Sequence, residues 1–225
     1  MYQTTSQLGN VQGVKGLIYG KAGIGKTRLA ATVPNCLIIA TEPGLLSLNG
    51  FNIPYIEAKT VAQLNDIARW IHSSAEAKQF GSFYFDSLSE TLEIIVAEER
   101  PKAGKEPRRA YNELLIQATA LIKSYRDLSG PNIFFTAKQS KSQDGDTGMM
   151  LYGPKMPGKA MGDESPYLFD FVFNLYVYVD PATQSRQWLF RTQPDNQYEA
   201  KDRSGRLAPI EPADLGYIVR KVMGA

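Results

Sequence analysis

The sequence predicts an α/β domain with a mostly parallel central sheet, flanking helices and an antiparallel edge at its C-terminal end. Through the first 136 residues, apolar strand-like runs alternate with helical segments, which is the pattern of a parallel sheet. A glycine-rich segment, 20–27, joins the first strand to the first helix. Nearer the C-terminus two strand-like runs follow one another directly, which is typical of antiparallel pairing.

The parallel part of the sheet is predicted from short apolar runs separated by helical patterns. In the clearest helix, Leu64, Ile67 and Ile71 recur at the spacing of one buried helix face. The predicted strands cover 14–19, 35–40, 53–56, 82–86 and 132–136. The predicted helices cover 26–32, 61–77, 88–99 and 111–128, with a basic loop at 101–109.

The C-terminal part is predicted to hold a long loop, a meander and a closing helix. Segment 138–166 is rich in Gly, Lys, Asp and Met and has no sustained period, and a connection this long is usually functional or disordered. Strands are then expected at 171–179 and 186–191, and a helix at 212–223. No repeat or linker divides the chain, so we expect one domain, 1–225, in which 1–12 form a flexible polar arm.

The composition is that of an ordinary globular protein. Hydrophobic residues make up 43% of the 225 residues and charged residues 21%, and the net charge is +2, so a nucleic-acid-binding surface has to be local. Cys36 and His72 are single, which excludes an intramolecular disulfide and a Cys/His zinc cluster. No signal sequence or apolar run of about 20 residues is visible, so we expect a cytoplasmic protein without a membrane segment.

Residues 20–27 read GKAGIGKT and match the phosphate-binding loop pattern GxxxxGK[ST] at every fixed position. The glycines let backbone N–H groups surround a polyphosphate, Lys26 reaches its β- and γ-phosphates, and the Thr27 hydroxyl ligates Mg²⁺. The predicted nucleotide-binding residues are Gly20, Lys21, Ala22, Gly23, Ile24, Gly25, Lys26, Thr27 and Arg28.

Two acidic residues complete the predicted catalytic site. Asp86 ends an apolar strand and is predicted to support Mg²⁺, directly or through water, although it also stands where a helix N-cap is expected. Glu42 follows the strand after the first helix, at the edge of a parallel sheet where ligands bind, and is predicted to activate water as a general base. The alternative for Glu42 is a solvated loop residue before Pro43.

Three further cations stand at informative positions. Lys138 or Gln139, at the end of the strand 132–136, is predicted to sense the γ-phosphate, and the choice between them depends on the strand register. Lys201 and Arg203, two residues apart on an extended segment, point to the same side. A solvated charged turn is the alternative for this pair.

Eight segments together resemble a known family over nearly the whole chain. They are 20–27, 40–42, 85–87, 136–138, 153–160, 166–170, 191–195 and 201–205. The chain resembles the RecA-like ATP-binding proteins of bacteriophages, in particular the single-strand annealing group called the "Sak four" type. One departure is Lys138, which stands where bacterial RecA has a Gln.

This resemblance implies a RecA-like P-loop ATPase core that uses ATP and Mg²⁺ and works in the cytoplasm of a phage's bacterial host. It implies single-stranded DNA as a partner, ATP hydrolysis stimulated by DNA, and a role in recombination or annealing beside a single-strand-binding protein. It also implies a homo-oligomer, filament or ring, with ATP at the subunit interface. Lys201 and Arg203 would then reach the γ-phosphate of the neighbouring subunit, as an arginine finger does.

Segment 138–166 is predicted to be the mobile DNA-binding loop. Lys141, Lys155 and Lys159 would neutralise phosphates and Tyr152 would pack against bases, with an oligomer repeating these weak contacts along a strand. A disordered surface loop is the alternative. The basic stretch Lys102, Lys105, Arg108 and Arg109 is a rival DNA contact or a solvated loop.

Two other functions remain open on the sequence. The near-neutral charge suits an ATP-driven switch or assembly protein that acts on a protein partner without DNA. A P-loop small-molecule kinase is less favoured, because no arginine-rich lid segment is visible.

Overall fold

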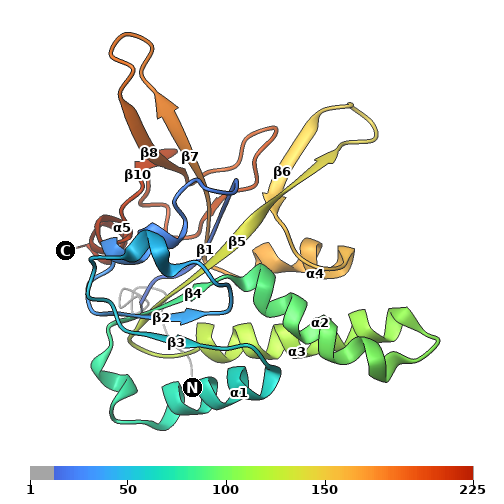
Figure 1. Ribbon diagram of the computed structural model, residues 1–225. Coiled ribbons are helices and arrows are strands. Elements are labelled where there is room, and N and C mark those ends of the chain that lie inside the picture. Colours follow the sequence, from blue (N-terminus) through green and yellow to red (C-terminus); the bar gives the residue numbers. More distant parts are fainter. Residues whose placement is uncertain (1–12, 225) are drawn as a thin grey trace, which may run out of the picture.

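The computed structural model describes residues 13–224, so the predicted arm at 1–12 lies outside the described residues. One sheet runs through the molecule, and helices cover both of its faces (Figure 1). The strands are β1 (Lys15–Gly20), β2 (Cys36–Ala40), β3 (Tyr55–Glu57), β4 (Ser82–Asp86), β5 (Asn132–Gln143), β6 (Met150–Pro154), β7 (Phe171–Val179), β8 (Arg186–Arg191), β9 (Lys201–Asp202) and β10 (Ile210–Pro212). The α-helices are α1 (Val61–Ser73), α2 (Leu88–Ala103), α3 (Pro107–Arg126), α4 (Lys159–Glu164) and α5 (Leu215–Met223). The 3₁₀ helices are η2 (Thr27–Thr32), η3 (Leu45–Leu48), η4 (Ala77–Gln79) and η5 (Ser165–Leu168).

The order of the strands confirms the predicted fold class. The sheet reads β10-β8-β7-β1-β5-β4-β2-β3. All neighbours from β7 to β3 are parallel, whereas β8 and β10 pair antiparallel at the C-terminal edge. The protein is therefore an α/β domain with a mixed, mostly parallel sheet and an antiparallel C-terminal edge.

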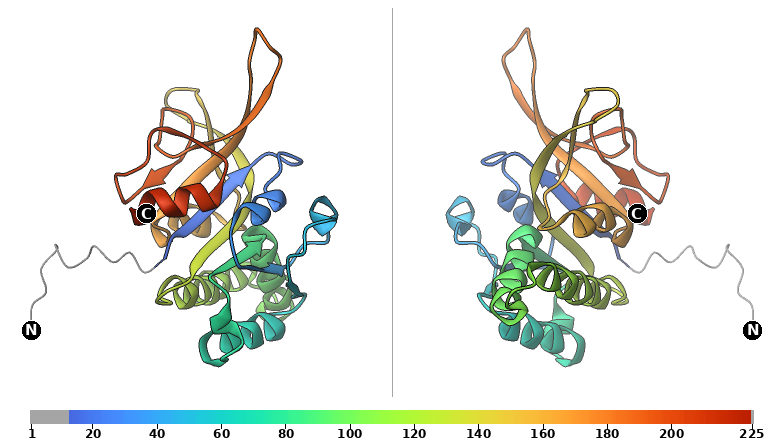
Figure 2. Two further views of the ribbon diagram at one scale, coloured as in Figure 1. Left: turned by 90° about the vertical axis from the view of Figure 1, so that its left-hand side faces the viewer. Right: turned by 90° about the vertical axis from the view of Figure 1, so that its right-hand side faces the viewer.

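Two apolar layers hold the sheet between its helices, whose arrangement around the sheet is drawn in Figure 2. Because side chains alternate along a strand, Leu17 and Tyr19 of β1 pack toward α1, α2 and α3, whereas Ile18 packs toward α5 and η2. These residues are fully buried, so burial on both faces explains why β1 reads as a continuous apolar run. Among the described residues, no helix is long and apolar enough to cross a membrane.

The predicted helices differ from the structure in extent, and one predicted loop is largely helical. The first helix is only the 3₁₀ helix η2, and the predicted helix 61–77 ends at Ser73. The predicted basic loop 101–109 is mostly helical, because Pro101 lies in the last turn of α2 and Pro107 takes the first turn of α3, where a missing N–H costs little. Gly104, with φ 58°, ends α2.

The prediction of a long irregular loop at 138–166 is wrong. Strand β5 continues to Gln143 and pairs antiparallel with β6, and α4 and η5 follow. We call the hairpin 138–154 the β5–β6 arm; it projects from the sheet in Figure 1. Lys141, Ser142 and Gln143 are all exposed, so neither face of the arm needs apolar residues and the sequence carries no alternation that marks a strand.

Candidate nucleotide-binding site

A cavity of about 620 Å³ opens at the carboxyl ends of β1, β2, β4 and β5. Parallel strands bring their ends to one edge of the sheet, so residues far apart in sequence meet there. Of the predicted site residues, the cavity is lined by Lys21, Ala22, Gly23, Gly25, Lys26, Thr27, Glu42, Asp86, Lys138, Lys141 and Lys155. Gly20, Ile24 and Arg28 belong to the same loop but do not line this cavity.

The phosphate loop is held in shape by two aromatic side chains from distant strands. The Tyr84 hydroxyl of β4 donates to the Lys26 carbonyl at 2.5 Å, and the Trp188 indole of β8 donates to the Ile24 carbonyl at 3.0 Å. Gly25 has φ 104°, a conformation that favours glycine. Sequence analysis found neither aromatic residue, because each reaches the loop through the tertiary fold.

The Lys26 ammonium lies over the loop. Its Nζ donates to the carbonyls of Gly20 and Lys21, each at 3.0 Å. Burial lowers the pKa of Lys26, while the carboxylates of Asp86 and Glu42 act in the opposite direction. A cation held in this position and partly removed from water is suited to bind phosphate oxygens.

Thr27 and Asp86 form the centre of a hydrogen-bonded chain. The Thr27 hydroxyl donates to Oδ2 of Asp86 and the Thr136 hydroxyl donates to Oδ1, both at 2.6 Å. Asp86 is not the N-cap of α2, because Ser87 accepts from the Glu90 N–H instead. A hydroxyl and a carboxylate at hydrogen-bonding distance are hard oxygen donors of the kind that Mg²⁺ prefers, so these residues fit the ion.

Glu42 is held at the rim of the same cavity. Its carboxylate accepts a hydrogen bond from the Ser87 hydroxyl and lies 3.5 Å from Nζ of Lys138. The Ser87 backbone is in turn fixed by the Thr41 hydroxyl, which donates to its carbonyl at 2.9 Å and accepts from its N–H at 3.0 Å. This carboxylate has the chemistry and the position to orient a water molecule toward a phosphate.

Both candidates for the γ-phosphate sensor line the cavity. Lys138 pairs with Glu90 at 2.8 Å, and this hydrogen bond raises the pKa of Lys138. Gln139 instead accepts a hydrogen bond from the buried amide of Asn174 at 3.3 Å. The choice between Lys138 and Gln139 therefore stays a prediction.

Lys201 and Arg203 lie away from the phosphate loop of their own chain. Strand β9 pairs with Phe171 and Val172 at the start of β7, whereas the loop follows the other end of the parallel strand β1. Lys201 donates to the Phe169 carbonyl at 2.7 Å, and Arg203 pairs with Asp170 at 2.5 Å. Neither lines the nucleotide cavity, so any contact with a γ-phosphate has to be made in another subunit.

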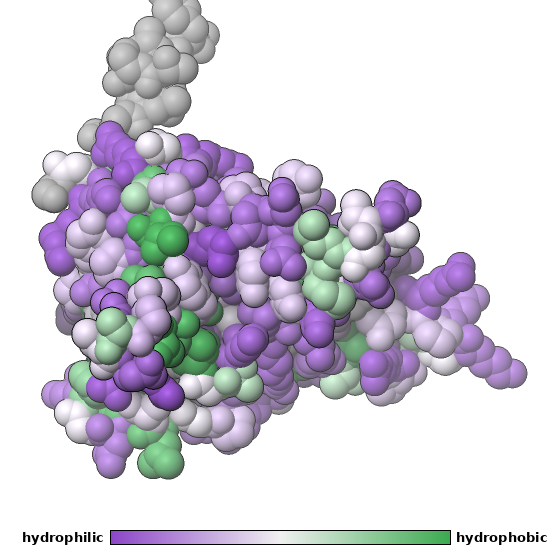
Figure 3. Space-filling view, turned by 90° about the horizontal axis from the view of Figure 1, so that it is seen from above, coloured by the Kyte–Doolittle hydropathy of each residue, from purple (hydrophilic) through white to green (hydrophobic). Residues whose placement is uncertain are grey.

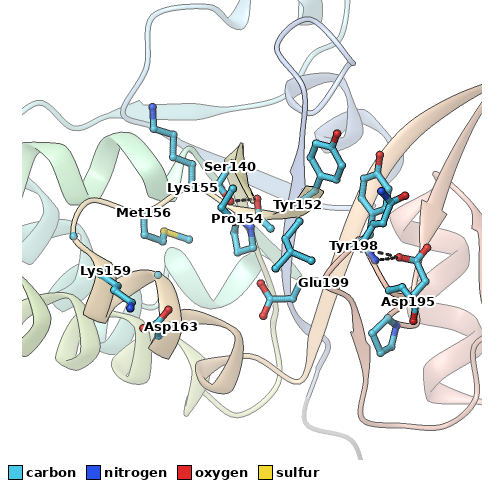
Figure 4. A pocket seen from close by; sticks show the side chains of 18 residues that line it. Ser140, Tyr152, Pro154, Lys155, Met156, Lys159, Asp163, Asp195, Tyr198 and Glu199 are labelled. Atoms are coloured by element: carbon cyan, nitrogen blue, oxygen red, sulfur yellow. Dashed lines mark hydrogen bonds between the residues drawn. The ribbon is translucent and has the colours of Figure 1, made fainter. Parts of the chain in front are cut away.

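A second cavity, of about 690 Å³, borders the β5–β6 arm (Figure 4). It is lined by three of the four predicted DNA-binding residues, namely Tyr152, Lys155 and Lys159, and the fourth, Lys141, lines the nucleotide cavity. Lys155 and Ser140 line both cavities. The arm therefore separates two sites that share side chains.

Aromatic and acidic groups shape this second cavity. The rings of Tyr152 and Tyr198 stack with centroids 4.7 Å apart, and the Arg191 guanidinium lies 4.4 Å from the Tyr198 centroid. Burial, and then the nearby Asp163, raise the pKa of Glu199. In Figure 4 the carboxylates of Asp163 and Glu199 lie on the same side of the cavity. Figure 3, which views the molecule from above relative to Figure 1, shows a mostly hydrophilic face with small apolar patches.

One comparison with known proteins, the match to a family model, agrees with a nucleotide-binding role. A family model described as "AAA domain" matches residues 12–204. Among solved structures, a KaiC-like protein from the hyperthermophilic archaeon Pyrococcus horikoshii OT3 is 16% identical, with 84% of this chain and 82% of that chain covered and a TM-score of 0.44. A search of the curated proteins finds no match. Because the family model spans most of the sequence, the chain belongs to the AAA domain family and is an AAA-type P-loop ATPase domain.

Proposed function

We propose that this protein is an ATP-dependent, RecA-like single-stranded-DNA-binding protein that acts in recombination or annealing as a homo-oligomer. The observation that carries the proposal is the shared wall of the two cavities. Lys155 and Ser140 belong both to the site with the phosphate loop and to the site with Tyr152 and Lys159. A ligand that moves Lys155 or Ser140 in one cavity therefore changes the lining of the other.

Hydrolysis in the first site would use groups that line the nucleotide cavity. The loop amides and Lys26 would hold the β- and γ-phosphates, and Thr27 and Asp86 would hold Mg²⁺, directly or through water. Bound Mg²⁺ would supply positive charge to the phosphates. Glu42 orients the attacking water and accepts its proton, while Lys138 stands beside that carboxylate, 3.5 Å away.

The β5–β6 arm carries the state of the nucleotide to the second site. Lys141 and Lys155 line the nucleotide cavity, so the charge of a bound triphosphate attracts both ammonium groups. At the base of the arm, Ser89 accepts from the Lys138 N–H at 3.0 Å and donates to the Lys155 carbonyl at 2.7 Å. The arm is thus tied to α2, which begins two residues after Asp86.

Single-stranded DNA is the ligand that best suits the second site. Exposed Lys155 and Lys159 provide positive charge for phosphates, and the Tyr152–Tyr198 stack provides an aromatic surface beside them. Asp163 and Glu199 keep the affinity of one subunit low, so an oligomer that repeats the site along the strand is needed for tight binding. In that oligomer Lys201 and Arg203 contact the γ-phosphate of the next subunit.

Lys159 gives the sharpest test, because it lines the second cavity and not the nucleotide cavity. We expect Lys159→Ala to weaken binding to a labelled oligo(dT) and to flatten its salt dependence, since one phosphate contact is lost. The affinity for ATP should stay unchanged. Lys123→Ala, an exposed lysine of α3 outside both cavities, is the matched control.

The ATPase rate with and without DNA separates the competing functions. DNA-stimulated hydrolysis together with filaments or rings supports the proposal. Hydrolysis with no DNA binding by the wild type at any salt concentration supports a switch that acts on a protein partner. Transfer of phosphate to a small acceptor identifies a kinase.

A further inference from the structure

A third cavity, of about 520 Å³, adjoins the outer side of the phosphate loop. It shares Gly23 and Gly25 with the nucleotide cavity, so the two cavities border the same part of the phosphate loop. Its other walls come from the phosphate loop, from η2, from β8 and from the segment before α5. They are Ile24, Arg28, Leu29, Thr32, Trp188 and Ala213. Most of these side chains are apolar, unlike the charged lining of the nucleotide cavity.

Trp188 is held as a fixed aromatic surface in this cavity. Its Nε1 donates to the Ile24 carbonyl at 3.0 Å, and a Cβ at Gly25 would lie 3.6 Å from the same nitrogen. The hydrogen bond fixes the position of the ring edge, yet the residue remains 47% exposed. Among the described residues, no aromatic ring stacks on it. The ring therefore offers an open apolar face beside the phosphate loop, on which a ligand can stack.

We propose that this cavity is the nucleobase site, and that the base of the bound nucleoside triphosphate stacks on Trp188. This inference rests on the proposed function, because it assigns the base of the nucleotide whose phosphates the loop holds. The positions of two consecutive residues agree with this assignment. Thr27 faces the phosphate cavity, whereas the next residue, Arg28, lines the third cavity. A volume of about 520 Å³ is ample for a base and a ribose.

The polar groups of this cavity point to weak discrimination between bases. The Arg28 guanidinium lies over the Phe51 ring, 5.7 Å from its centroid. The Thr32 hydroxyl already donates to the Leu29 carbonyl at 2.7 Å and accepts from the Leu215 N–H at 2.9 Å. The Ala213 N–H is used by the Trp188 carbonyl at 2.9 Å. Stacking, which any aromatic base can provide, therefore supplies most of the affinity of this site.

The test compares ATP with inorganic tripolyphosphate, which has the phosphates without the base. In calorimetric titrations, Trp188→Ala should weaken ATP binding by about tenfold, the usual size of one base–aromatic stack. Tripolyphosphate binding should weaken by a clearly smaller factor, because Trp188→Ala also removes the hydrogen bond to the Ile24 carbonyl, and that loss acts on the phosphates of both ligands alike. Tyr178→Ala, an exposed aromatic residue of β7 outside this cavity, is the matched control and should change neither affinity.

A second variant and a spectroscopic signal separate stacking from support of the loop. Trp188→Phe keeps an aromatic ring but loses the bond to Ile24, and it should retain most of the preference for ATP over tripolyphosphate. The chain has two tryptophans, so Trp70→Phe leaves Trp188 as the only indole, and ATP but not tripolyphosphate should quench its fluorescence.

Equal losses of ATP and tripolyphosphate affinity in Trp188→Ala would overturn the base site and leave Trp188 as a support of the loop. Unchanged ATP affinity would overturn it as well. These results are distinct from failure of the proposed function, in which the wild type itself binds neither ligand.

Discussion

Ser89 joins the nucleotide cavity to the β5–β6 arm, and its removal tests that connection. The side chain is only 3% exposed. Its hydroxyl accepts from the Lys138 N–H at 3.0 Å and donates to the Lys155 carbonyl at 2.7 Å, and the Lys155 N–H donates to the Lys138 carbonyl at 2.7 Å. Both strands of the arm are therefore attached to α2 through one hydroxyl group.

The expected cost of Ser89→Ala follows from these two contacts. Each lost hydrogen bond lowers the free energy of unfolding by about 1 kcal/mol, so together they lower it by about 2 kcal/mol. For a chain of this size, 1 kcal/mol corresponds to about 2–4 °C in the melting temperature, which gives a decrease of about 4–8 °C. Differential scanning calorimetry measures this decrease, and hydrogen exchange should show faster exchange of the arm's amides.

Ser73→Ala is the control for Ser89→Ala. Ser73 also forms a serine hydrogen bond, to the Arg69 carbonyl at 2.8 Å, but it is exposed at the end of α1. Its substitution should change the free energy of unfolding by less than about 0.5 kcal/mol. If Ser89→Ala melts within about 1 °C of the wild type, and its arm amides exchange at the wild-type rate, the hydroxyl does not hold the arm.

Three further experiments test the chemistry, the second cavity and the subunit interface. Glu42→Gln should lower the single-turnover rate of ATP hydrolysis by about 10²–10⁴-fold and leave ATP binding intact, because it removes only the general base; a normal rate would exclude Glu42 from that role. The pKa of Glu199 is raised above its ordinary value of 4.5, so the stability that its carboxyl contributes is present below that value and is lost as the pH rises through the folded-state pKa. Urea unfolding should accordingly show Glu199→Gln to be more stable than the wild type at pH 7 but not at pH 4, and equal stability at pH 7 would contradict the assigned cause. Arg203→Ala and Lys26→Ala should each be inactive alone but regain part of the ATPase activity when mixed. At a mixed interface the Arg203→Ala subunit supplies an intact phosphate loop, and the Lys26→Ala subunit supplies an intact Arg203. No recovery in mixed oligomers would argue against a contribution of Arg203 in trans.

The sequence predicts the buried strands and the phosphate loop well, because their signals are local. All five residues of β2, from Cys36 to Ala40, are buried, so the strand appears as an unbroken apolar run. Asp86 and Glu42 could be placed beside the phosphate loop because they follow strands of a parallel sheet, and such strands end at one edge; both line the same cavity as the loop. Neither inference needs the packing of distant segments.

The rest depends on tertiary contacts that leave no local pattern. Trp188 lies 164 positions from Ile24, and their contact requires both the order of β7 and β8 and their register. The composition around Lys141 and Lys155 predicts a DNA-binding loop, but β5 and β6 form an arm whose base borders the cavity with the phosphate loop, and both lysines line that cavity. Thr136 was visible as a strand residue, yet its bond to Asp86 depends on the alignment of β4 with β5.

Isothermal titration calorimetry with Mg²⁺ and ATP tests the central claim most directly. The account predicts one binding site per wild-type chain, and loss of the binding heat in Lys26→Ala although that variant keeps its fold by circular dichroism. A folded wild-type protein that gives no heat with any nucleoside triphosphate, or a Lys26→Ala variant that binds as tightly as the wild type, would contradict it.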